Sequence, residues 1–355
     1  MKESHQFHPK KLKKQIFIAL LVSISSFIII FSFFSWQEIP NDFRVRKPIY
    51  LFIAMFILVV AWSIDAFRIY FTCKAWNKNI RLREAFKTVL SGYFFGGITP
   101  ANAGGSVAEI YVLKQAGLSW GEAGSLTTIC GILYQISLIL LFLFLFVGSS
   151  VSFVIRTRLM NLIYTFFLVY SILIGVLFII IQKPQLILVI VEKVMNRLKK
   201  RFPSLEETRK NVLNWIEAFL REFKDGFYIF FIKKPQYLFL NLGMHMLYFF
   251  AYFSVAYFIL FALGIDSSHM EVIRIQIPIF FTFGIVPTPG ASGGVELALT
   301  TTFASLLGSE QAGTFVFYWR VITYYITLII GGVIFFRCLE KSGNRNEIVD
   351  TNDVE

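Results

Sequence analysis

Long apolar segments alternate with short polar segments along most of the chain. About six of them are long enough to cross a hydrocarbon layer of about 30 Å as helices. These segments are residues 15–36, 49–69, 122–147, 159–181, 237–263 and 312–336. The pattern predicts an all-α polytopic membrane protein with about six full transmembrane helices.

Two further apolar segments are interrupted by runs of Gly, Pro and small polar residues. The first has arms at 85–98 and 106–117 around its tip, and the second occupies 272–307. Each arm is too short to cross a membrane, and irregular backbone survives there only where protein buries it or where it lines a polar cavity. We expect two re-entrant hairpins of broken helices, with a pair of tilted spans as the alternative at each place.

An internal duplication relates the two breaks. A shift of 189 positions places Thr99-Pro100 on Thr288-Pro289 and Gly104-Gly105 on Gly293-Gly294. An odd number of full spans separates the hairpins, so the two repeats are expected to run in opposite directions. An inverted pseudo-twofold axis would then bring both tips together near the midplane, where transporters built from such repeats bind their cargo.

The distribution of charge predicts the orientation of these segments. The chain has a formal net charge of +12, and its basic residues gather at 1–14, 74–87 and 183–234, beside apolar segments. Excess Lys and Arg is typical of cytoplasmic loops, so we expect a plasma-membrane protein with both termini in the cytoplasm. The same distribution favours anionic inner-leaflet lipids, and not nucleic acid, as partners of residues 183–234.

One integral membrane domain is expected to cover residues 1–340. Its repeat motifs occupy 85–148 and 272–338. In the cytoplasmic segment 183–234, apolar residues recur at helical spacing, which predicts two amphipathic helices on the inner surface. Residues 341–355 are polar, and we expect them to form a disordered cytoplasmic tail.

The sequence offers no pattern for a metal or a cofactor. Cys73, Cys130 and Cys338 are far apart and lack the spacing of metal ligands or of a disulfide framework. The Gly-rich tip is not followed by Gly-Lys-Ser/Thr, so it is not a nucleotide-binding loop. We therefore expect neither a cofactor nor a metal site.

The two tips supply most of the candidate substrate-binding residues. Each break exposes backbone N–H groups at the start of the returning half-helix, where Asn102 and Ser292 are the expected caps and where anions are attracted. The alternative is that the Gly and Pro residues serve only turns and tight packing. The candidates are Pro100, Asn102, Gly104, Gly105, Pro287, Pro289, Gly290, Ser292, Gly293 and Gly294.

Ionisable residues near the tips form a second group of candidates. Glu296 follows the second break and Arg320 lies in the last span, with Tyr318 and Tyr324 close to it in sequence. These two charges form either a structural salt bridge or a pair in which a lipid phosphate replaces Glu296 on Arg320. Glu109 is either the first-repeat counterpart of Glu296 or a solvated charge at the cytoplasmic mouth.

Asp65 and Arg68 are second-tier candidates, because they share one helical face near the inner end of their span. A local ion pair, with Arg68 reaching the inner headgroups, is the expected arrangement, and a functional role is the alternative. His245 and Tyr134 are expected to be core or interfacial residues.

Two motifs resemble a known family over nearly the whole chain. The segment Glu109-Ile110-Tyr111-Val112-Leu113-Lys114 follows the first break, and the second motif is Pro287-Thr288-Pro289-Gly290-Ala291-Ser292-Gly293-Gly294-Val295-Glu296 with a later Tyr318-Trp319-Arg320. They resemble the membrane domain of the lysylphosphatidylglycerol synthase family. The family usually has an Arg in the span after each motif, but the first-repeat position equivalent to Arg320 is Gly131.

The resemblance implies a function. Some family members join a soluble domain that lysinylates phosphatidylglycerol to a membrane domain that flips the product, and others are stand-alone flippase-like proteins. Fewer than 20 residues follow the last span, which implies the translocating half without the synthase. We therefore expect a lipid translocase that moves a phospholipid or polyprenyl-linked lipid with a phosphate-bearing headgroup.

Two alternatives to a translocase stay open. One is a membrane-embedded lipid aminoacyltransferase, similar to phosphatidylglycerol lysyltransferase, or a glycosyltransferase, with Glu109 or Glu296 as its reactive group. The other is a non-transporting accessory subunit that docks a lipid-modifying enzyme through residues 183–234.

Overall fold

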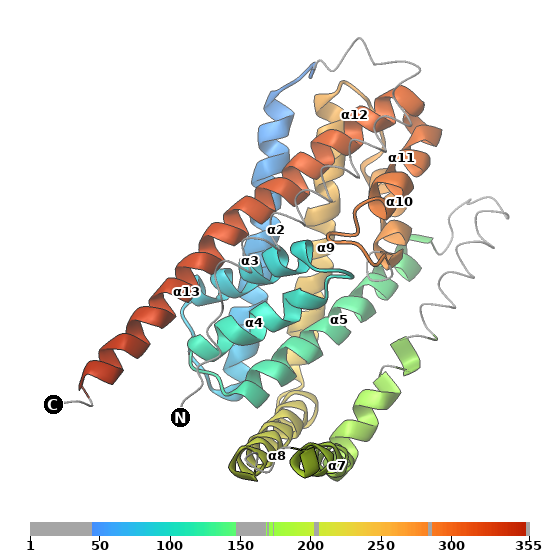
Figure 1. The fold of residues 1–355 in the computed structure, drawn as a ribbon. Coiled ribbons are helices and arrows are strands. Elements are labelled where there is room, and N and C mark those ends of the chain that lie inside the picture. Colours follow the sequence, from blue (N-terminus) through green and yellow to red (C-terminus); the bar gives the residue numbers. More distant parts are fainter. Residues whose placement is uncertain are drawn as a thin grey trace.

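The computed structural model describes residues 45–146, 168–201 apart from 169 and 173, 206–282 and 286–352. The predicted first span lies outside these residues, as do residues 159–167, 169 and 173 of the predicted fourth span. All named elements in the described ranges are helical. The chain is therefore an all-α polytopic membrane protein (Figure 1).

Four helical stretches of the described residues are long and apolar enough to cross a membrane. They comprise α2 (Ile49–Cys73) with the 3-10 turn η1 (Lys74–Trp76), α5 (Trp120–Phe146), α9 (Gln236–Ala262), and α12 (Ser309–Arg320) continued by the π-helical turn η4 (Val321–Tyr325) and α13 (Ile326–Asn352). A fifth candidate joins Tyr170–Gln182 to Pro184–Arg197 through a bend of 86°. These stretches match the predicted second, third, fifth and sixth spans, and the fifth candidate overlaps the fourth.

Both predicted breaks interrupt helices. The first lies between α3 (Leu82–Ile98) and α4 (Ala103–Gln115), and the second between α10 (His269–Thr282) and α11 (Gly294–Leu307). The longest of these arms, α3, has 17 residues and reaches about 25 Å at the rise of an α-helix, which is short of a full crossing. The arms of each hairpin pack on one another, as a re-entrant hairpin requires.

The two tips have the same backbone conformation and meet. Positive φ angles occur at Ala101 (50°) and Asn102 (59°), and again at Gly290 (60°) and Ala291 (52°), which are the equivalent positions of the second repeat. An isolated antiparallel bridge pairs Pro100 with Pro289, also equivalent residues. Pairing of equivalent residues is what a pseudo-twofold axis between the tips produces, so the predicted meeting of the two tips is confirmed.

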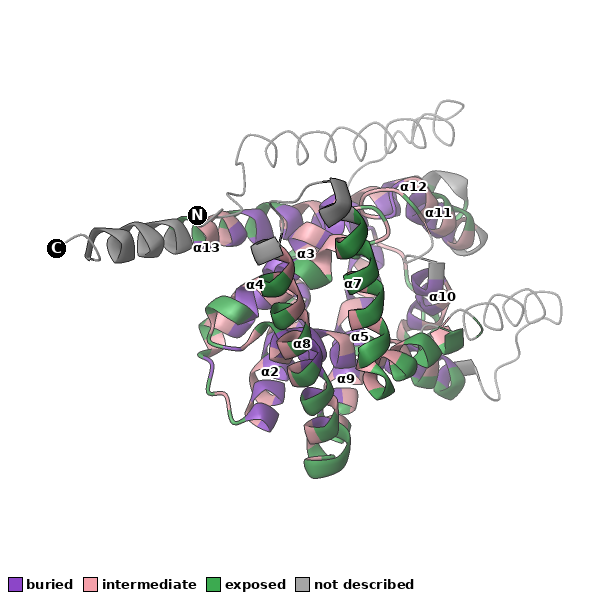
Figure 2. Cartoon of the chain, turned by 60° about the horizontal axis from the view of Figure 1, so that its bottom comes forward, coloured by how far each residue is buried: buried purple, intermediate pink, exposed green. Residues whose placement is uncertain are grey.

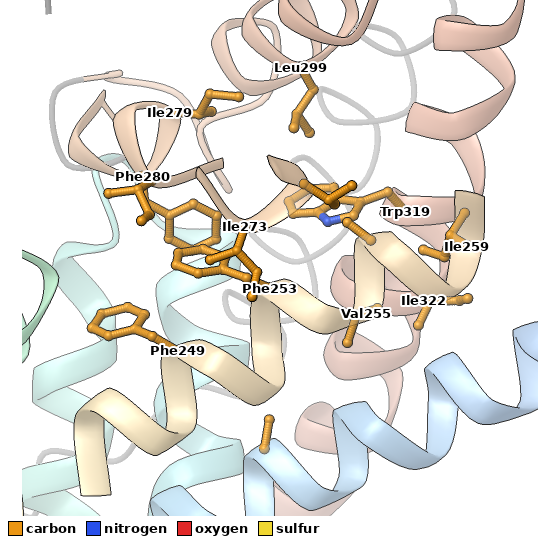
Figure 3. Packing of buried hydrophobic residues seen from close by; sticks show 14 of the residues in the cluster. Phe249, Phe253, Val255, Ile259, Ile273, Ile279, Phe280, Leu299, Trp319 and Ile322 are labelled. Atoms are coloured by element: carbon orange, nitrogen blue, oxygen red, sulfur yellow. The ribbon is translucent and has the colours of Figure 1, made fainter. Parts of the chain in front are cut away.

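The repeats share one apolar core. The equivalent helices α2 and α9 run side by side through the middle of the molecule (Figure 1). Figure 3 shows Phe253 of α9 beside Phe280 of α10, with the rings edge to face at 4.7 Å between centroids. Trp319 of α12, 1% exposed, completes this layer. Van der Waals packing of these side chains holds the second hairpin against α9.

Glycines bring the first hairpin and α13 into close contact. A Cβ on Gly105 would lie 3.0 Å from the carbonyl oxygen of Gly92 across the α3–α4 interface. A Cβ on Gly331 of α13 would collide with the carbonyl oxygen of Leu90 on α3. Small residues allow helices to approach closely in a membrane, so α3 lies tightly between α4 and α13.

Two helices occupy the segment predicted to hold two amphipathic helices. They are α7 (Pro184–Arg201) and α8 (Glu206–Tyr228), which continues as the π-helical turn η3 (Ile229–Lys233). Figure 2 shows that both expose much of their surface. Helix α8 also packs against the membrane-spanning helix α5, where Glu222 accepts a hydrogen bond from the Gly121 N–H at 3.2 Å.

The C-terminal tail differs from the expectation. We expected disorder from residue 341, whereas α13 continues as a helix to Asn352. The polar residues of the tail thus extend the helix of the last span.

Candidate functional site

A cavity of about 340 Å³ lies between the two tips and the central helices. Aromatic and charged side chains of α2, α3, α4, α5, α9 and α12 surround it, together with residues of the second tip. Its lining includes Trp62, Asp65, Arg68, Tyr93, Asn102, Gly105, Ser106, Glu109, Cys130, Gly131, Tyr134, His245, Tyr248, Tyr252, Gly290, Trp319, Arg320, Thr323 and Tyr324. A polar cavity at this depth is the arrangement expected where irregular backbone lies inside a membrane protein.

Arg320 forms a buried ion pair with Glu296. Its Nε lies 2.8 Å from Glu296 Oε1, and the two side chains are 3% and 1% exposed. Glu296 Oε2 accepts the N–H of Gly293 at 2.7 Å, which caps α11. Arg320 Nη1 donates to the carbonyl oxygen of Gly290 at 3.2 Å. Its Nη2 is buried and has no hydrogen-bond partner among the described residues.

Tyr324 connects Arg320 to both tips. The guanidinium carbon of Arg320 lies 4.9 Å from the centre of the Tyr324 ring, a cation–π distance. The Tyr324 hydroxyl donates to the carbonyl oxygen of Gly97 in the first repeat at 3.0 Å. A Cβ on Gly290 would overlap the same ring, so only glycine allows the second tip to approach Tyr324 this closely.

A second ion pair faces the cavity from the first repeat. Arg68 Nε lies 2.6 Å from Asp65 Oδ1, and the Tyr93 hydroxyl donates to Asp65 Oδ2 at 2.7 Å. Arg68 is 4% exposed and its Nη1 has no hydrogen-bond partner in the described part of the chain. Arg68 therefore does not extend to the inner headgroups. That expectation was wrong, because the packing of α2 turns this face toward the cavity.

Glu109 also lines the cavity, on the face of α4 that carries Asn102, Gly105 and Ser106. Its side chain lies against Gly92 of α3, where an added Cβ would be 2.7 Å from Oε1. Glu109 is therefore a partly exposed side chain on the cavity face of the hairpin. It is not the counterpart of Glu296, since Glu296 caps a helix and Glu109 lies within one.

The caps of the returning half-helices differ from those expected. At α4, Thr99 Oγ1 accepts the N–H of Gly104 at 2.8 Å, and Asn102 makes no capping hydrogen bond with its side chain. At α11 the capping position is Gly293 and not Ser292. At each of these ends a side chain therefore accepts a hydrogen bond from a backbone N–H, that of Gly104 or of Gly293.

The structure divides the candidates into two groups. Asp65, Arg68, Asn102, Gly105, Glu109, Gly290, Arg320 and Tyr324 line the cavity. Pro100, Gly104, Pro287, Pro289, Ser292, Gly293, Gly294, Glu296 and Tyr318 are not among its lining residues. In this second group, Pro100 and Pro289 join the tips, and Glu296 acts on the cavity through Arg320.

Several lining residues were not singled out from the sequence, or were expected elsewhere. Tyr248 and Tyr252 lie in the apolar helix α9, where no periodicity marks the face that meets the cavity, and Tyr93 lies in the apolar second half of α3. Tyr134 and His245, expected in the core or at the interface, both line it, with ring centres 5.8 Å apart. The sequence signal that could have identified these residues is a tyrosine in the middle of an apolar span, because its buried hydroxyl needs a hydrogen-bond partner and therefore faces polar groups.

The first repeat has Gly131 at the position equivalent to Arg320, so its cavity cation comes from another helix. An added Cβ at Gly131 would meet no atom within 4 Å, because the position opens into the cavity. Arg68 supplies the first-repeat cation from α2. In the described residues, no group of three or more His, Cys, Asp or Glu side chains is placed to hold a metal ion.

Comparison with known proteins agrees with this architecture. The lysylphosphatidylglycerol synthase TM region family matches residues 16–331. A UPF0104 membrane protein of Archaeoglobus fulgidus is 22% identical over 320 residues, which cover 89% of this chain and 94% of that protein. No solved structure matches the chain significantly. The chain belongs to the lysylphosphatidylglycerol synthase transmembrane region family.

Proposed function

We propose that this protein is a lipid translocase that moves a phospholipid, or a polyprenyl-linked lipid, with a phosphate-bearing headgroup between the leaflets. One observation carries the proposal. The cavity between the tips contains two buried arginines, and each has a guanidinium nitrogen without a hydrogen-bond partner among the described residues, Nη1 of Arg68 and Nη2 of Arg320.

The free nitrogens suit a phosphate because of the cost of buried charge. A buried arginine is expensive in a membrane unless it is fully paired and hydrogen-bonded. Phosphate oxygens accept charge-assisted hydrogen bonds from the planar guanidinium fork. At an effective dielectric near 20, opposite charges about 4 Å apart attract by roughly 4 kcal/mol before desolvation, enough for a phosphate to compete with Glu296 for Arg320.

The size of the cavity fits a headgroup better than a whole lipid. Its volume of about 340 Å³ is near the lower end of the range of about 300–1,000 Å³ for small-molecule sites. The acyl chains would therefore stay in the bilayer while the headgroup enters. Inverted repeats around such a site allow alternate access from the two leaflets.

The proposal includes a plasma-membrane location, cytoplasmic termini and contact of α7 with inner-leaflet anionic lipids. Exposed apolar residues Leu186, Val189, Ile190 and Val194 recur along one side of α7 at helical spacing. An 86° bend at the start of α7 turns it away from the preceding apolar helix. An amphipathic helix in that orientation would lie along the membrane surface.

Lipid movement in reconstituted vesicles tests the proposal. A fluorescent phosphatidylglycerol analogue placed in both leaflets can be bleached from outside with dithionite, and translocation appears as loss of the protected half. We expect Arg320→Gln to abolish the movement in folded protein. Arg320→Lys should retain part of it, because the charge remains while the bidentate fork is lost.

The double variant Arg320→Met with Glu296→Met separates transport from stability. It removes both charges of the buried pair, so folding should be restored relative to either single change. If Arg320 binds phosphate, the folded double variant moves no lipid. Transport at the wild-type rate would rule out that role, and absence of lipid movement by the wild-type protein would refute the translocase.

A further inference from the structure

Glu109 differs from the other charged side chains of the cavity because it has no ion-pair or hydrogen-bond partner in the part of the chain that the structure describes. Asp65 pairs with Arg68, and Arg320 pairs with Glu296 outside the lining. No ion pair or hydrogen bond to the Glu109 carboxylate is formed by the described residues. The cavity thus has one surplus carboxylate beside two neutral pairs.

The fold makes room for this carboxylate. Gly92 of α3 lies directly beneath it, and a Cβ there would be 2.8 Å from Glu109 Cγ. Any larger residue at position 92 would push the side chain away from its place. The Glu109 side chain therefore packs against Gly92 of the hairpin and lines the cavity.

The groups around Glu109 leave it dependent on a single cation. Arg68 attracts it and Asp65 repels it, both from α2. The other titratable groups that line the cavity nearby are Tyr93 on α3, Cys130 and Tyr134 on α5, and His245 and Tyr248 on α9. Arg68 already pairs with Asp65, so an ionised Glu109, partly exposed to the cavity, would be a charge without a full partner, which is unfavourable inside a membrane protein.

A lipid phosphate and an ionised Glu109 would compete for the same place. Arg68 Nη1 is buried and has no hydrogen-bond partner among the described residues, so it can donate to the Glu109 carboxylate or to a phosphate oxygen. When a singly charged phosphate is bound and Glu109 is protonated, the site has one net negative charge, that of the phosphate. With the site empty, ionised Glu109 provides that same charge. The two states are then electrically equivalent.

We propose that Glu109 takes up one proton when the headgroup binds and releases it when the headgroup leaves, so that a proton accompanies each anionic lipid. This inference rests on the proposed function. It assigns Glu109 the role of proton carrier, and Arg68 Nη1 the role of the donor that passes from carboxylate to phosphate. No bond is made or broken apart from transfer of the proton between Glu109 and water in the cavity.

The pH dependence of transport tests the inference in the full-length protein. Phosphatidylcholine vesicles with a trace of fluorescent phosphatidylglycerol are assayed between about pH 5 and pH 9. We expect the wild-type rate to fall as pH rises, approaching about tenfold per pH unit, the limit for loss of one proton. Glu109→Gln should stay active with a rate independent of pH, and Glu109→Asp should keep the dependence.

Glu84→Gln is the matched control, because Glu84 lies on the same hairpin but outside the cavity, paired with Lys87 at 2.7 Å. It should keep the wild-type pH profile. An unchanged profile in Glu109→Gln would overturn the proton role while the translocase stands. Loss of all transport by folded Glu109→Gln would also overturn it, since Glu109 would then be a ligand of the cargo.

A second measurement does not depend on transport. Infrared spectra of the purified protein across the same pH range should contain a protonated-carboxyl band that titrates, is absent from Glu109→Gln and is present in Glu84→Gln. Absence of such a band from the wild-type protein overturns the inference whether or not lipid moves. Absence of lipid movement with the band intact would instead refute the proposed function.

Discussion

The two repeats have the same broken backbone but hold their tips in different ways. In the first repeat, glycines of α3 and α4 let the two arms approach closely, and Thr99 caps the returning helix. In the second repeat, Glu296 caps the returning helix and pairs with Arg320 of the next span. One hairpin is therefore held by the fit of small residues, and the other by a buried charge pair.

The charges follow the same division. The second repeat matches one carboxylate with one cation, and both are almost fully buried. The first repeat places two carboxylates, Asp65 and Glu109, around Arg68. The comparison teaches that the duplication determines where the cavity lies, whereas its chemistry depends on side chains at positions that the duplication does not relate.

The largest expected effect comes from removing one carboxylate from each ion pair. Glu296→Gln leaves Arg320 buried and unpaired, which should lower the free energy of unfolding by about 3–5 kcal/mol. Asp65→Asn should cost less, because Glu109 lies beside Arg68 and can replace the lost partner. Thermal unfolding of both variants in the same detergent measures the difference.

The smaller loss of stability expected for Asp65→Asn depends on Glu109, which can replace Asp65 as the partner of Arg68. In a Glu109→Gln background, Asp65→Asn should become about as costly as Glu296→Gln, because no substitute partner remains. Equal losses for the two single variants in the wild-type background would contradict the idea that the first repeat has a spare carboxylate.

Sequence reasoning predicted the breaks and their meeting because these depend on local signals. Gly and Pro interrupt an apolar helix wherever they cluster, and the gap-free match of Thr99-Pro100 to Thr288-Pro289 fixes the pairing of the tips. The faces of the full spans could not be predicted in this way. A helix apolar on all sides has no preferred side, so the inward position of Arg68, Tyr134 and His245 depends on packing between α2, α5 and α9.

A medium effect is expected at the equivalent glycines Gly105 and Gly294. In Gly105→Ala the new methyl group would meet the backbone of α3, whose Gly92 carbonyl oxygen is 3.0 Å away and cannot rotate out of reach. Overpacking of this kind costs about 1–3 kcal/mol. In Gly294→Ala the new group meets the side chain of Val286 in an irregular segment, so the loss should be smaller.

Unfolding of the two variants, measured side by side, sharpens the contrast between the hairpins. Gly131→Ala is the control, because its new methyl group enters open space. It should lose no stability, and helix propensity should raise stability by at most about 1 kcal/mol. A greater loss for Gly294→Ala than for Gly105→Ala would show that the second hairpin is also held by close glycine packing.

The smallest effect concerns the left-handed residues of the tips. Ala101 has a φ of 50°, a conformation that costs an ordinary residue about 1–2 kcal/mol, and its equivalent in the second repeat is Gly290. Ala101→Gly removes this strain but adds freedom to the unfolded chain, which offsets about 0.5–1 kcal/mol. The net gain should be at most about 1.5 kcal/mol, seen as a slightly higher unfolding temperature.

Ala103→Gly is the control, because Ala103 is the first residue of α4, two positions further on. This change should lower stability, because a helical glycine gains nothing from a left-handed region and loses about 1 kcal/mol of helix propensity. Destabilisation by both changes would mean that the tip is relaxed with alanine at position 101, and that the left-handed turn shared by the repeats stores no strain there.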